Sequence, residues 1–355
     1  MDQLKTMNGT GEGVAAAIRA GDQSAFTAVA ERHRRELLVH CYRMLGSFHD
    51  AEDALQETFL RAWRYRESLE DGAPLRPWLY RVATNACLDA IARDNRRSAL
   101  ARAADEEKGS SRFGAAEVTW LQPFPDRLLE PAAQRDSEPE ALLLIQESVE
   151  LAFLTVIQLL TPQQRAALIL RDVLGWSAKE AADLLGVSVA AANSALQRAR
   201  ATLRTQLPPR KPEWPSGVEA SAAERELLRK YVDAAEQQDL AALESLIRED
   251  AVFRMPPDPL ITVGRDAILR LWAAGGFGSE RFGRVRCVTT RANRQPAVAY
   301  YVLANGETTY KALTLVVLRI EEGGIAEVVN FLPEVFEAFG LPPTLESTTG
   351  TTEAS

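Results

Sequence analysis

Apolar residues recur three and four positions apart through most of the first 207 residues, a spacing that is typical of helices with one buried face. The stretches that show this spacing are residues 26–45, 50–63, 77–97, 140–160 and 161–207. Gly46 follows the first of them as a helix-ending residue, Asp50 opens the second, and Pro77 opens the third. The pattern predicts an all-helical N-terminal part that becomes ordered near Val14.

The stretch 161–207 predicts two short helices joined by a tight turn. Ser177 and Glu180 form a capping-box start, Gly186 ends the first helix, and Ser188 caps the second. In the second helix the apolar stripe is Val189, Ala192, Leu196, Ala199 and Leu203. The opposite face carries Ala190, Ala191, Asn193, Ser194, Gln197, Arg198, Arg200 and Arg204. Small residues followed by amides and guanidinium groups suit the major groove of DNA, whereas the alternative is an ordinary antiparallel helix pair.

The helix predicted over 77–97 has a wide apolar stripe and a basic opposite face. The stripe is Trp78, Leu79, Val82, Ala83, Ala86, Cys87, Ala90 and Ile91. The other face is Tyr80, Arg81, Thr84, Asn85, Asp89, Arg93, Arg96 and Arg97. Arginines beside an amide and an aromatic ring can bind phosphates and unstacked bases. A solvated face in which Asp89 pairs with Arg93 is the alternative.

The helix predicted over 50–63 has an acidic first turn on its exposed side. Its buried side is Ala51, Ala54, Leu55, Thr58, Phe59, Ala62 and Trp63, and its exposed side is Glu52, Asp53, Gln56, Glu57 and Arg61. Acidic residues there favour the helix dipole, and they could equally form a docking surface for another protein. Periodicity alone does not choose between these two explanations.

The chain changes character after residue 98. Residues 98–141 predict a linker, within which Trp120-Leu121-Gln122-Pro123-Phe124-Pro125 forms an extended apolar stretch that we expect to dock on another surface. Prolines between 208 and 215 mark a hinge. Predicted helices follow at 223–237, 240–247 and 264–274, with the segment 251–257 before the last of them. Runs of strand composition come next, at 285–291, 297–303, 311–320 and 325–332. This order predicts an α+β domain with a curved, mostly antiparallel sheet, and a disordered tail after Pro343.

Composition and charge narrow the function. The 355 residues carry a net charge of −8, which opposes DNA binding until it is divided along the chain. Residues 26–102 carry +2 and 161–211 carry +5, whereas 103–160 and 212–355 carry −7 each. The positive charge therefore lies in the two segments with candidate DNA-binding faces. No membrane-spanning run or signal peptide is evident, which predicts a cytoplasmic protein without membrane contact.

The cysteines and histidines do not indicate a metal site. Cys41, Cys87 and Cys287 each sit in an apolar pattern, and we expect them to be reduced core residues. His33, His40 and His49 match no zinc-finger spacing. We therefore expect no metal, no cofactor and no catalytic residue.

Taken together, the two helical blocks resemble regions two and four of bacterial sigma factors of the extracytoplasmic-function (ECF) group. The matching stretches are DAEDALQETFLRAW (50–63), PLRPWLYRVATNACLDAIARDNRR (74–97) and TPQQR…GWSAKEAADLLGVSVAAANSALQRAR within 161–200. The resemblance implies promoter DNA and core RNA polymerase as partners, the latter through its β′ clamp helices and β flap. The residues implied to bind core polymerase are Asp50, Glu52, Asp53, Gln56 and Glu57.

The same resemblance assigns two DNA surfaces. Those implied to bind the minus-ten element are Ser68, Trp78, Arg81, Asn85, Asp89, Arg93, Arg96 and Arg97, with the loop 68–75 holding a flipped base. Those implied to bind the minus-thirty-five element are Ser188, Ala190, Ala191, Asn193, Ser194, Gln197, Arg198 and Arg200.

The C-terminal block is similar to the SnoaL-like, nuclear-transport-factor-two-like cone fold. The similarity lies in LIREDAVFRMPPDP (246–259), Gly264-Arg265-Asp266 and a late strand ending in Asn330-Phe331. Some ECF sigma factors carry such an extension with a WLQPFPD-like linker, which implies a regulator acting in cis and leaves open an unknown small ligand. Two alternatives remain, a ligand-sensing helix-turn-helix regulator that acts without polymerase, and an enzyme using Asp258 or Asp266 as general base.

These inferences divide the chain into six segments. They are region two (14–100), a linker (101–141), region four (142–210), a Pro-rich hinge (211–221), the SnoaL-like domain (222–343) and a disordered tail (344–355).

Overall fold

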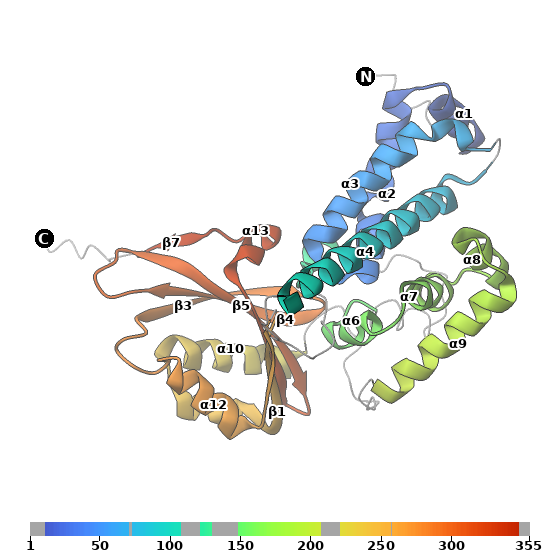
Figure 1. The fold of residues 1–355 in the computed structure, drawn as a ribbon. Coiled ribbons are helices and arrows are strands. Elements are labelled where there is room, and N and C mark those ends of the chain that lie inside the picture. The colour runs from blue at the N-terminus through green and yellow to red at the C-terminus, as the bar shows by residue number, and fades with distance from the viewer. Residues whose placement is uncertain are drawn as a thin grey trace, which may run out of the picture. The chain divides into compact units, whose positions relative to one another are not determined.

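The computed structural model describes residues 11–70, 73–107, 121–129, 148–206, 221–256 and 258–347 (Figure 1). The chain forms two compact units. Unit 1 joins Met1–Thr119 to Leu128–Leu207, and unit 2 joins Trp120–Arg127 to Pro208–Ser355. Each unit is described below by itself.

The first helical module of unit 1 contains α1 to α4. Its elements are α1 (Gly11–Arg19), α2 (Gln23–Leu45), α3 (Phe48–Arg64), the 3-10 turn η1 (Arg66–Ser68) and α4 (Leu75–Glu107). Gly46 ends α2 with a φ of 75°, as predicted. The predicted start of α3 at Asp50 is wrong, because the Ser47 side chain accepts the Asp50 N–H and the helix begins at Phe48.

The bounds of two other helices also differ from the prediction. Helix α1 begins at Gly11, ahead of the expected onset of order at Val14. Helix α4 begins at Leu75, two residues before Pro77, because the carbonyl of Pro74 accepts the Trp78 N–H. It also continues to Glu107, past the predicted boundary at residue 100. A proline within the first turn is compatible with this start, since its missing N–H has no partner there in any case.

The second helical module contains α6 to α9. Its elements are α6 (Leu151–Gln158), α7 (Pro162–Leu168), the π-helical turn η3 (Ile169–Val173), α8 (Ala178–Leu185) and α9 (Val189–Gln206). Capping boxes start α7 at Thr161 and α8 at Ser177. The Ser188 hydroxyl accepts the Ala191 N–H at the start of α9, as predicted. Val189 is wrongly placed in the buried stripe, because it is 43% exposed in the first turn.

Unit 2 is an α+β domain, and the predicted fold class is confirmed. Helices α10 (Ala222–Gln237), α11 (Leu240–Leu246) and α12 (Arg265–Ala274) precede or interrupt the sheet. Its strands are β1 (Ile247–Met255), β2 (Asp258–Val263), β3 (Arg284–Ala292), β4 (Gln295–Leu303), β5 (Thr309–Glu321) and β6 (Gly324–Phe331). The sheet order is β2-β1-β6-β5-β4-β3, with β1 and β6 parallel and the other pairs antiparallel.

The core of unit 2 lies between one face of the sheet and α10, α11 and α12 (Figure 1). Phe253, Val298, Tyr300, Val316 and Val328 project into it from four strands and are all at most 6% exposed. The 3-10 turn η4 (Pro333–Val335) and α13 (Phe336–Phe339) follow β6. The Tyr301 ring contacts Phe336 at 5.3 Å between centroids, on the side of β4 opposite Tyr300.

Three strands were not predicted, namely β1, β2 and β7. β2 contains Pro259, and it lies at the edge of the sheet, where a residue without an N–H is tolerated. β7 (Thr344–Glu346) pairs with β5, so the prediction of a disordered tail from residue 344 is wrong for these residues. Residues 348–355, the hinge before 221 and most of the predicted linker lie outside the described residues.

Candidate nucleic-acid interface

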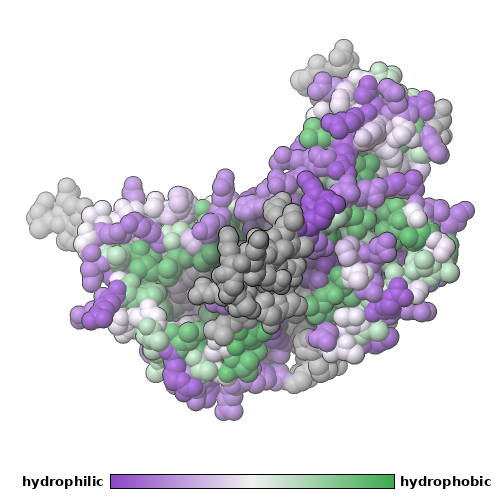
Figure 2. All heavy atoms as spheres, viewed as in Figure 1, coloured by the Kyte–Doolittle hydropathy of each residue, from purple (hydrophilic) through white to green (hydrophobic). Residues whose placement is uncertain are grey.

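The acidic side of α3 is exposed, as its periodicity predicts. Asp50, Glu52, Asp53 and Gln56 are exposed and Glu57 is half-buried. Leu60, one turn beyond Gln56, is 62% exposed. The face turned to the viewer over α3 and α4 is mainly hydrophilic in Figure 2.

The predicted outer face of α4 is partly correct. Arg81, Asn85, Asp89, Arg93 and Arg96 are exposed, Trp78 is half-buried, and the side chain of Arg97 lies outside the described residues. Ser68 is exposed at the end of η1, where its hydroxyl donates to the Tyr65 carbonyl at 2.7 Å. Tyr80 and Thr84 were predicted on this face but are 1% and 0% exposed.

A buried polar network explains why Tyr80 and Thr84 face inward. The Tyr80 hydroxyl donates to Glu36 at 3.1 Å, and the same carboxylate oxygen accepts the Arg76 Nε–H at 2.8 Å. The Thr84 hydroxyl donates to the Tyr80 carbonyl at 2.8 Å, so the Nε2 of His40, 2.9 Å from Thr84 Oγ1, carries the proton of the neutral ring. Burial lowers the pKa of His40 to about 3. These bonds tie α2 to the start of α4.

Arg61 links the acidic side of α3 to the basic side of α4. Its Nε donates to Glu57 at 2.6 Å and its Nη1 donates to Asp89 at 2.5 Å. Asp89 is therefore paired with Arg61 and not with Arg93, whose Nε reaches only the backbone carbonyl of Asp89 at 3.4 Å. The alternative with an Asp89–Arg93 ion pair is wrong. The sequence signal that was available is the arginine on the exposed side of 50–63.

The predicted outer face of α9 is exposed along its length. Ser188, Ala190, Ala191, Asn193, Gln197, Arg198 and Arg200 are exposed and Ser194 is half-buried. Arg198 Nη1 donates to Ser194 Oγ at 2.6 Å, one turn back on the same helix. Arg200 instead donates to Asp172 on η3 through two bonds. The first turn of α9 carries only small side chains, so another molecule can approach its backbone closely.

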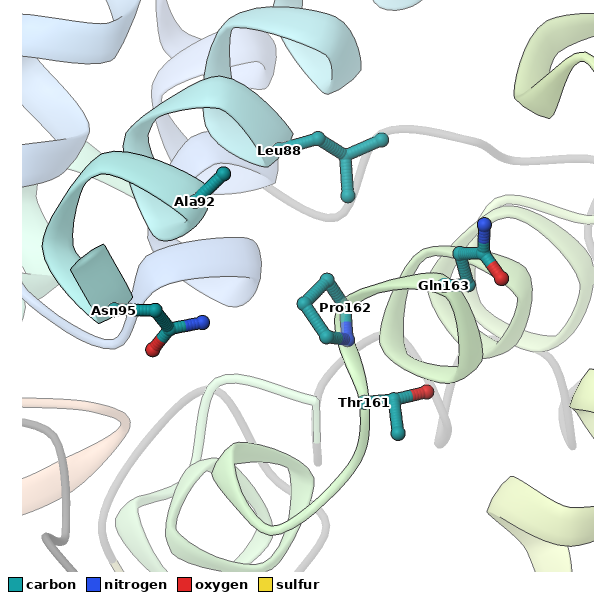
Figure 3. A pocket seen from close by; sticks show the side chains of 6 residues that line it. All are labelled: Leu88, Ala92, Asn95, Thr161, Pro162 and Gln163. Atoms are coloured by element: carbon teal, nitrogen blue, oxygen red, sulfur yellow. The ribbon is translucent and has the colours of Figure 1, made fainter. Parts of the chain in front are cut away.

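The two helical modules contact each other through residues that sequence reasoning did not single out. The Arg165 side chain is buried, and it donates to the carbonyls of Met44 on α2 and of Ile157, Gln158 and Leu160 around the end of α6. Burial lowers its pKa to about 10. The Trp176 ring meets Tyr80 edge-on at 5.8 Å. Beside these contacts a hollow of about 480 Å³ is lined by Leu88, Ala92, Asn95, Thr161, Pro162 and Gln163 (Figure 3).

The described part of the WLQPFPD segment is bound to unit 2. Pro125 forms a β-bridge with Ala292, and Phe124 is fully buried. Asn293 exchanges two hydrogen bonds with the Phe124 backbone, accepting its N–H at 2.8 Å and donating to its carbonyl at 2.9 Å. Asp126 accepts the Arg294 N–H at 2.8 Å and the Arg291 Nε–H at 3.2 Å. Burial nevertheless raises the pKa of Asp126.

Three family models match parts of this chain. Residues 29–97 match the family Sigma-70 region 2, 150–203 match Sigma-70, region 4, and 228–328 match the SnoaL-like domain. ECF RNA polymerase sigma factor SigG of Mycobacterium tuberculosis is 40% identical over 333 residues, covering 92% of this chain and 86% of SigG. This chain belongs to the ECF RNA polymerase sigma factors. The predicted family is therefore confirmed.

SigJ of M. tuberculosis gives a second comparison within the ECF sigma factors. It is 30% identical over 268 residues, covering 72% of this chain and 77% of SigJ. The crystal structure of SigJ superposes with a TM-score of 0.57 at 21% identity, covering 89% of this chain and all of that one, which supports the fold. As an ECF sigma factor the protein directs RNA polymerase to promoters, and it is an initiation factor and not an enzyme. No helix of the described residues is long and apolar enough to cross a membrane.

Proposed function

We propose that the acidic side of α3 binds the β′ clamp helices of core RNA polymerase. Asp50, Glu52, Asp53 and Gln56 support this because they form one exposed polar surface, with Glu57 at its margin. Leu60 adds an exposed apolar side chain next to these carboxylates. An apolar contact surrounded by charged groups is the usual anatomy of a tight protein interface. The β flap is the proposed partner of the second helical module.

We infer that α4 binds the minus-ten element. The supporting observation is a row of exposed polar side chains at i, i+4 spacing, Arg81, Asn85, Asp89 and Arg93, continued by Arg96. Trp78 and Ser68 flank the loop proposed to hold a flipped base, of which residues 71 and 72 lie outside the described residues. The Arg61–Asp89 ion pair links the helix proposed to bind polymerase to the helix proposed to bind the DNA strand.

We propose that α9 reads the minus-thirty-five element in the major groove. Ala190 and Ala191 allow the helix N-terminus to approach base edges, while Asn193, Gln197 and Arg198 provide exposed hydrogen-bonding groups further along. We expect the C-terminal half of the helix to contact phosphates.

We further propose that the SnoaL-like domain regulates the sigma factor in cis through the linker. The observation that supports this is the attachment of Phe124 and Asp126 to the β3–β4 turn of that domain. We infer that this attachment limits how freely the linker between regions two and four can move. The described core of the domain contains apolar side chains and the hydrogen-bonded pair Tyr231 and Tyr300. We assign regulation to the linker contact. A small ligand of this domain stays a prediction from sequence.

The test of polymerase binding is a pull-down of core RNA polymerase from the same organism with the full-length protein. Glu57→Lys is expected to weaken capture at least tenfold and Glu57→Gln much less, because only the lysine reverses the charge beside Arg61. The half-buried, solvent-accessible Glu57–Arg61 pair contributes about 0.5 kcal/mol or less to stability, so the circular-dichroism spectra of both variants should match the wild type. Wild-type protein that captures no core polymerase would contradict the proposal.

The test of cis regulation is run-off transcription with and without residues 215–355. We expect the initiation rate per bound polymerase to change on deletion, while capture of core polymerase stays intact. Unchanged initiation across a range of sigma concentrations would exclude a regulatory role for the domain.

A further inference from the structure

Arg200 lies on α9 among the predicted minus-thirty-five residues, but its guanidinium is already bound within the second helical module. Its Nε donates to Asp172 Oδ2 at 2.8 Å and its Nη2 donates to Asp172 Oδ1 at 2.6 Å. Two parallel bonds between a guanidinium and a carboxylate fix direction as well as distance. The Asp172 side chain is 17% exposed and that of Arg200 is 50% exposed, so half of this pair is shielded from water.

The position of Asp172 is set by an irregular element of the helical module. It lies in the π-helical turn η3 (Ile169–Val173), between α7 and the helix-turn-helix. An extra residue in such a turn rotates the following side chains relative to a regular α-helix, and turns of this kind are frequent at functional sites. The turn therefore directs the Asp172 carboxylate toward Arg200, which lies away from both ends of α9.

We propose that Asp172 is a positioning residue for DNA recognition: through its paired bonds to Arg200 it fixes the rotation of α9 about its axis. Arg200 then makes a structural contact within the second helical module and does not bind a phosphate. Arg198, in contrast, donates to Ser194 of its own helix and is free to turn toward DNA. The inference rests on the proposed minus-thirty-five function of α9.

The two roles predict different effects on DNA binding. A phosphate contact contributes equally to every sequence, and its loss reduces the salt dependence of binding by about one ion. A residue that orients the reading helix contributes to the preference for the correct sequence and leaves the salt dependence unchanged. The ratio of specific to non-specific affinity therefore separates the two roles.

The experiment uses full-length protein assembled with core polymerase. The probes are a duplex enriched by the wild-type holoenzyme from a randomised library and a shuffled duplex of the same composition, across a salt series. Arg200→Ala is expected to lower affinity for the enriched duplex about tenfold, the scale of one good base contact, and to leave the shuffled duplex and the salt slope unchanged. Arg198→Ala should weaken binding to both duplexes and reduce the slope.

Variants at Asp172 complete the test. Asp172→Asn should reduce the preference for the enriched duplex as Arg200→Ala does, and Asp172→Glu, which keeps a carboxylate, should retain most of it. Asp183→Asn removes an equivalent charge at an exposed position of α8 and should leave the preference unchanged. If Asp172→Asn fails to fold, Arg200→Ala and Asp172→Glu still decide the outcome.

The proposal is overturned if Arg200→Ala weakens both duplexes equally with a smaller salt slope, or if Asp172→Glu loses the preference while remaining folded. If the wild-type holoenzyme enriches no sequence, the proposed function of α9 fails instead. The structural role of the Asp172–Arg200 pair is then tested by a double-mutant cycle of Asp172→Asn and Arg200→Ala in urea unfolding. A coupling free energy of zero between the two residues overturns the proposal.

Discussion

A neutral histidine inside region two makes the stability of this module depend on pH. His40 is fully buried and its Nδ1 has no hydrogen-bond partner in the described structure. Desolvation lowers its pKa from 6.5 to about 3. Below pH 6.5 the unfolded chain therefore binds a proton that the folded chain does not, so stability falls as pH drops from 6.5 toward 3.

The prediction is that His40→Gln flattens this dependence. The wild type should lose up to about 1.4 kcal/mol of unfolding free energy for each pH unit below 6.5, in addition to any loss shared with the variant. The measurement is amide exchange of peptides from α2 and α4, corrected for intrinsic rates, compared between the two proteins at each pH. Parallel pH profiles would show that His40 is protonated in the folded protein.

The same residues show what sequence periodicity could and could not give. The exposed positions Arg81, Asn85 and Arg93 follow directly from the helical repeat. Tyr80 and Thr84 were placed outside because they are polar, yet both are buried. The partners that make their burial favourable, Glu36 and His40, lie more than 40 residues away in sequence. A one-dimensional pattern contains no information about such partners.

At the scale of elements, helix interiors were predictable and their ends and edges were not. The stripe spacing located α2, α3, α4 and α9, but α3 begins at the Ser47 cap and α4 at Leu75. β7 pairs with β5 through backbone hydrogen bonds, which need no apolar repeat to form. The segment around Phe124 was predicted to dock on another surface. The surface that it contacts is the β3–β4 turn at Asn293, more than 160 residues away in sequence, which the sequence pattern did not indicate.

The β3–β4 turn allows a test of how the segment 121–129 is attached to unit 2. Asn293 has a φ of 56° and accepts the buried Phe124 N–H. Asn293→Gly keeps the backbone conformation and removes the acceptor, so an unsatisfied N–H should cost about 1–3 kcal/mol. Amide protection of peptides covering 121–129 should then fall about tenfold or more. Asn305→Gly, at an exposed position after β4, is the control, and equal protection in both variants would show that the Asn293 side chain does not hold the segment.

At the scale of the whole molecule, the described arrangement of regions two and four is too short for α4 and α9 to bind both promoter elements as proposed. Helix α4 contacts α7, and α7 contacts α9. The two helices proposed to bind DNA, α4 and α9, are therefore separated by about two helix-packing distances of 10 Å each where these contacts lie. The minus-ten and minus-thirty-five elements lie about 25 base pairs apart, roughly 85 Å of duplex. If α4 and α9 bind these elements as proposed, the contacts of Arg165 and Trp176 with region two must break before both elements are bound.

This requirement predicts that locking the two regions together blocks initiation. Asn95 on α4 and Gln163 on α7 line the same hollow and are exposed, so Asn95→Cys with Gln163→Cys can be joined by a short bis-maleimide that contains a disulfide. The native Cys41 and Cys87 are buried and do not compete, and single-cysteine variants treated alike control for Cys287.

Run-off transcription should be lost in the cross-linked protein, and reduction should restore it. Binding to an isolated minus-thirty-five duplex should persist, because α9 lies outside the hollow. Full run-off activity in the cross-linked protein would mean that the contacts between regions two and four persist during initiation.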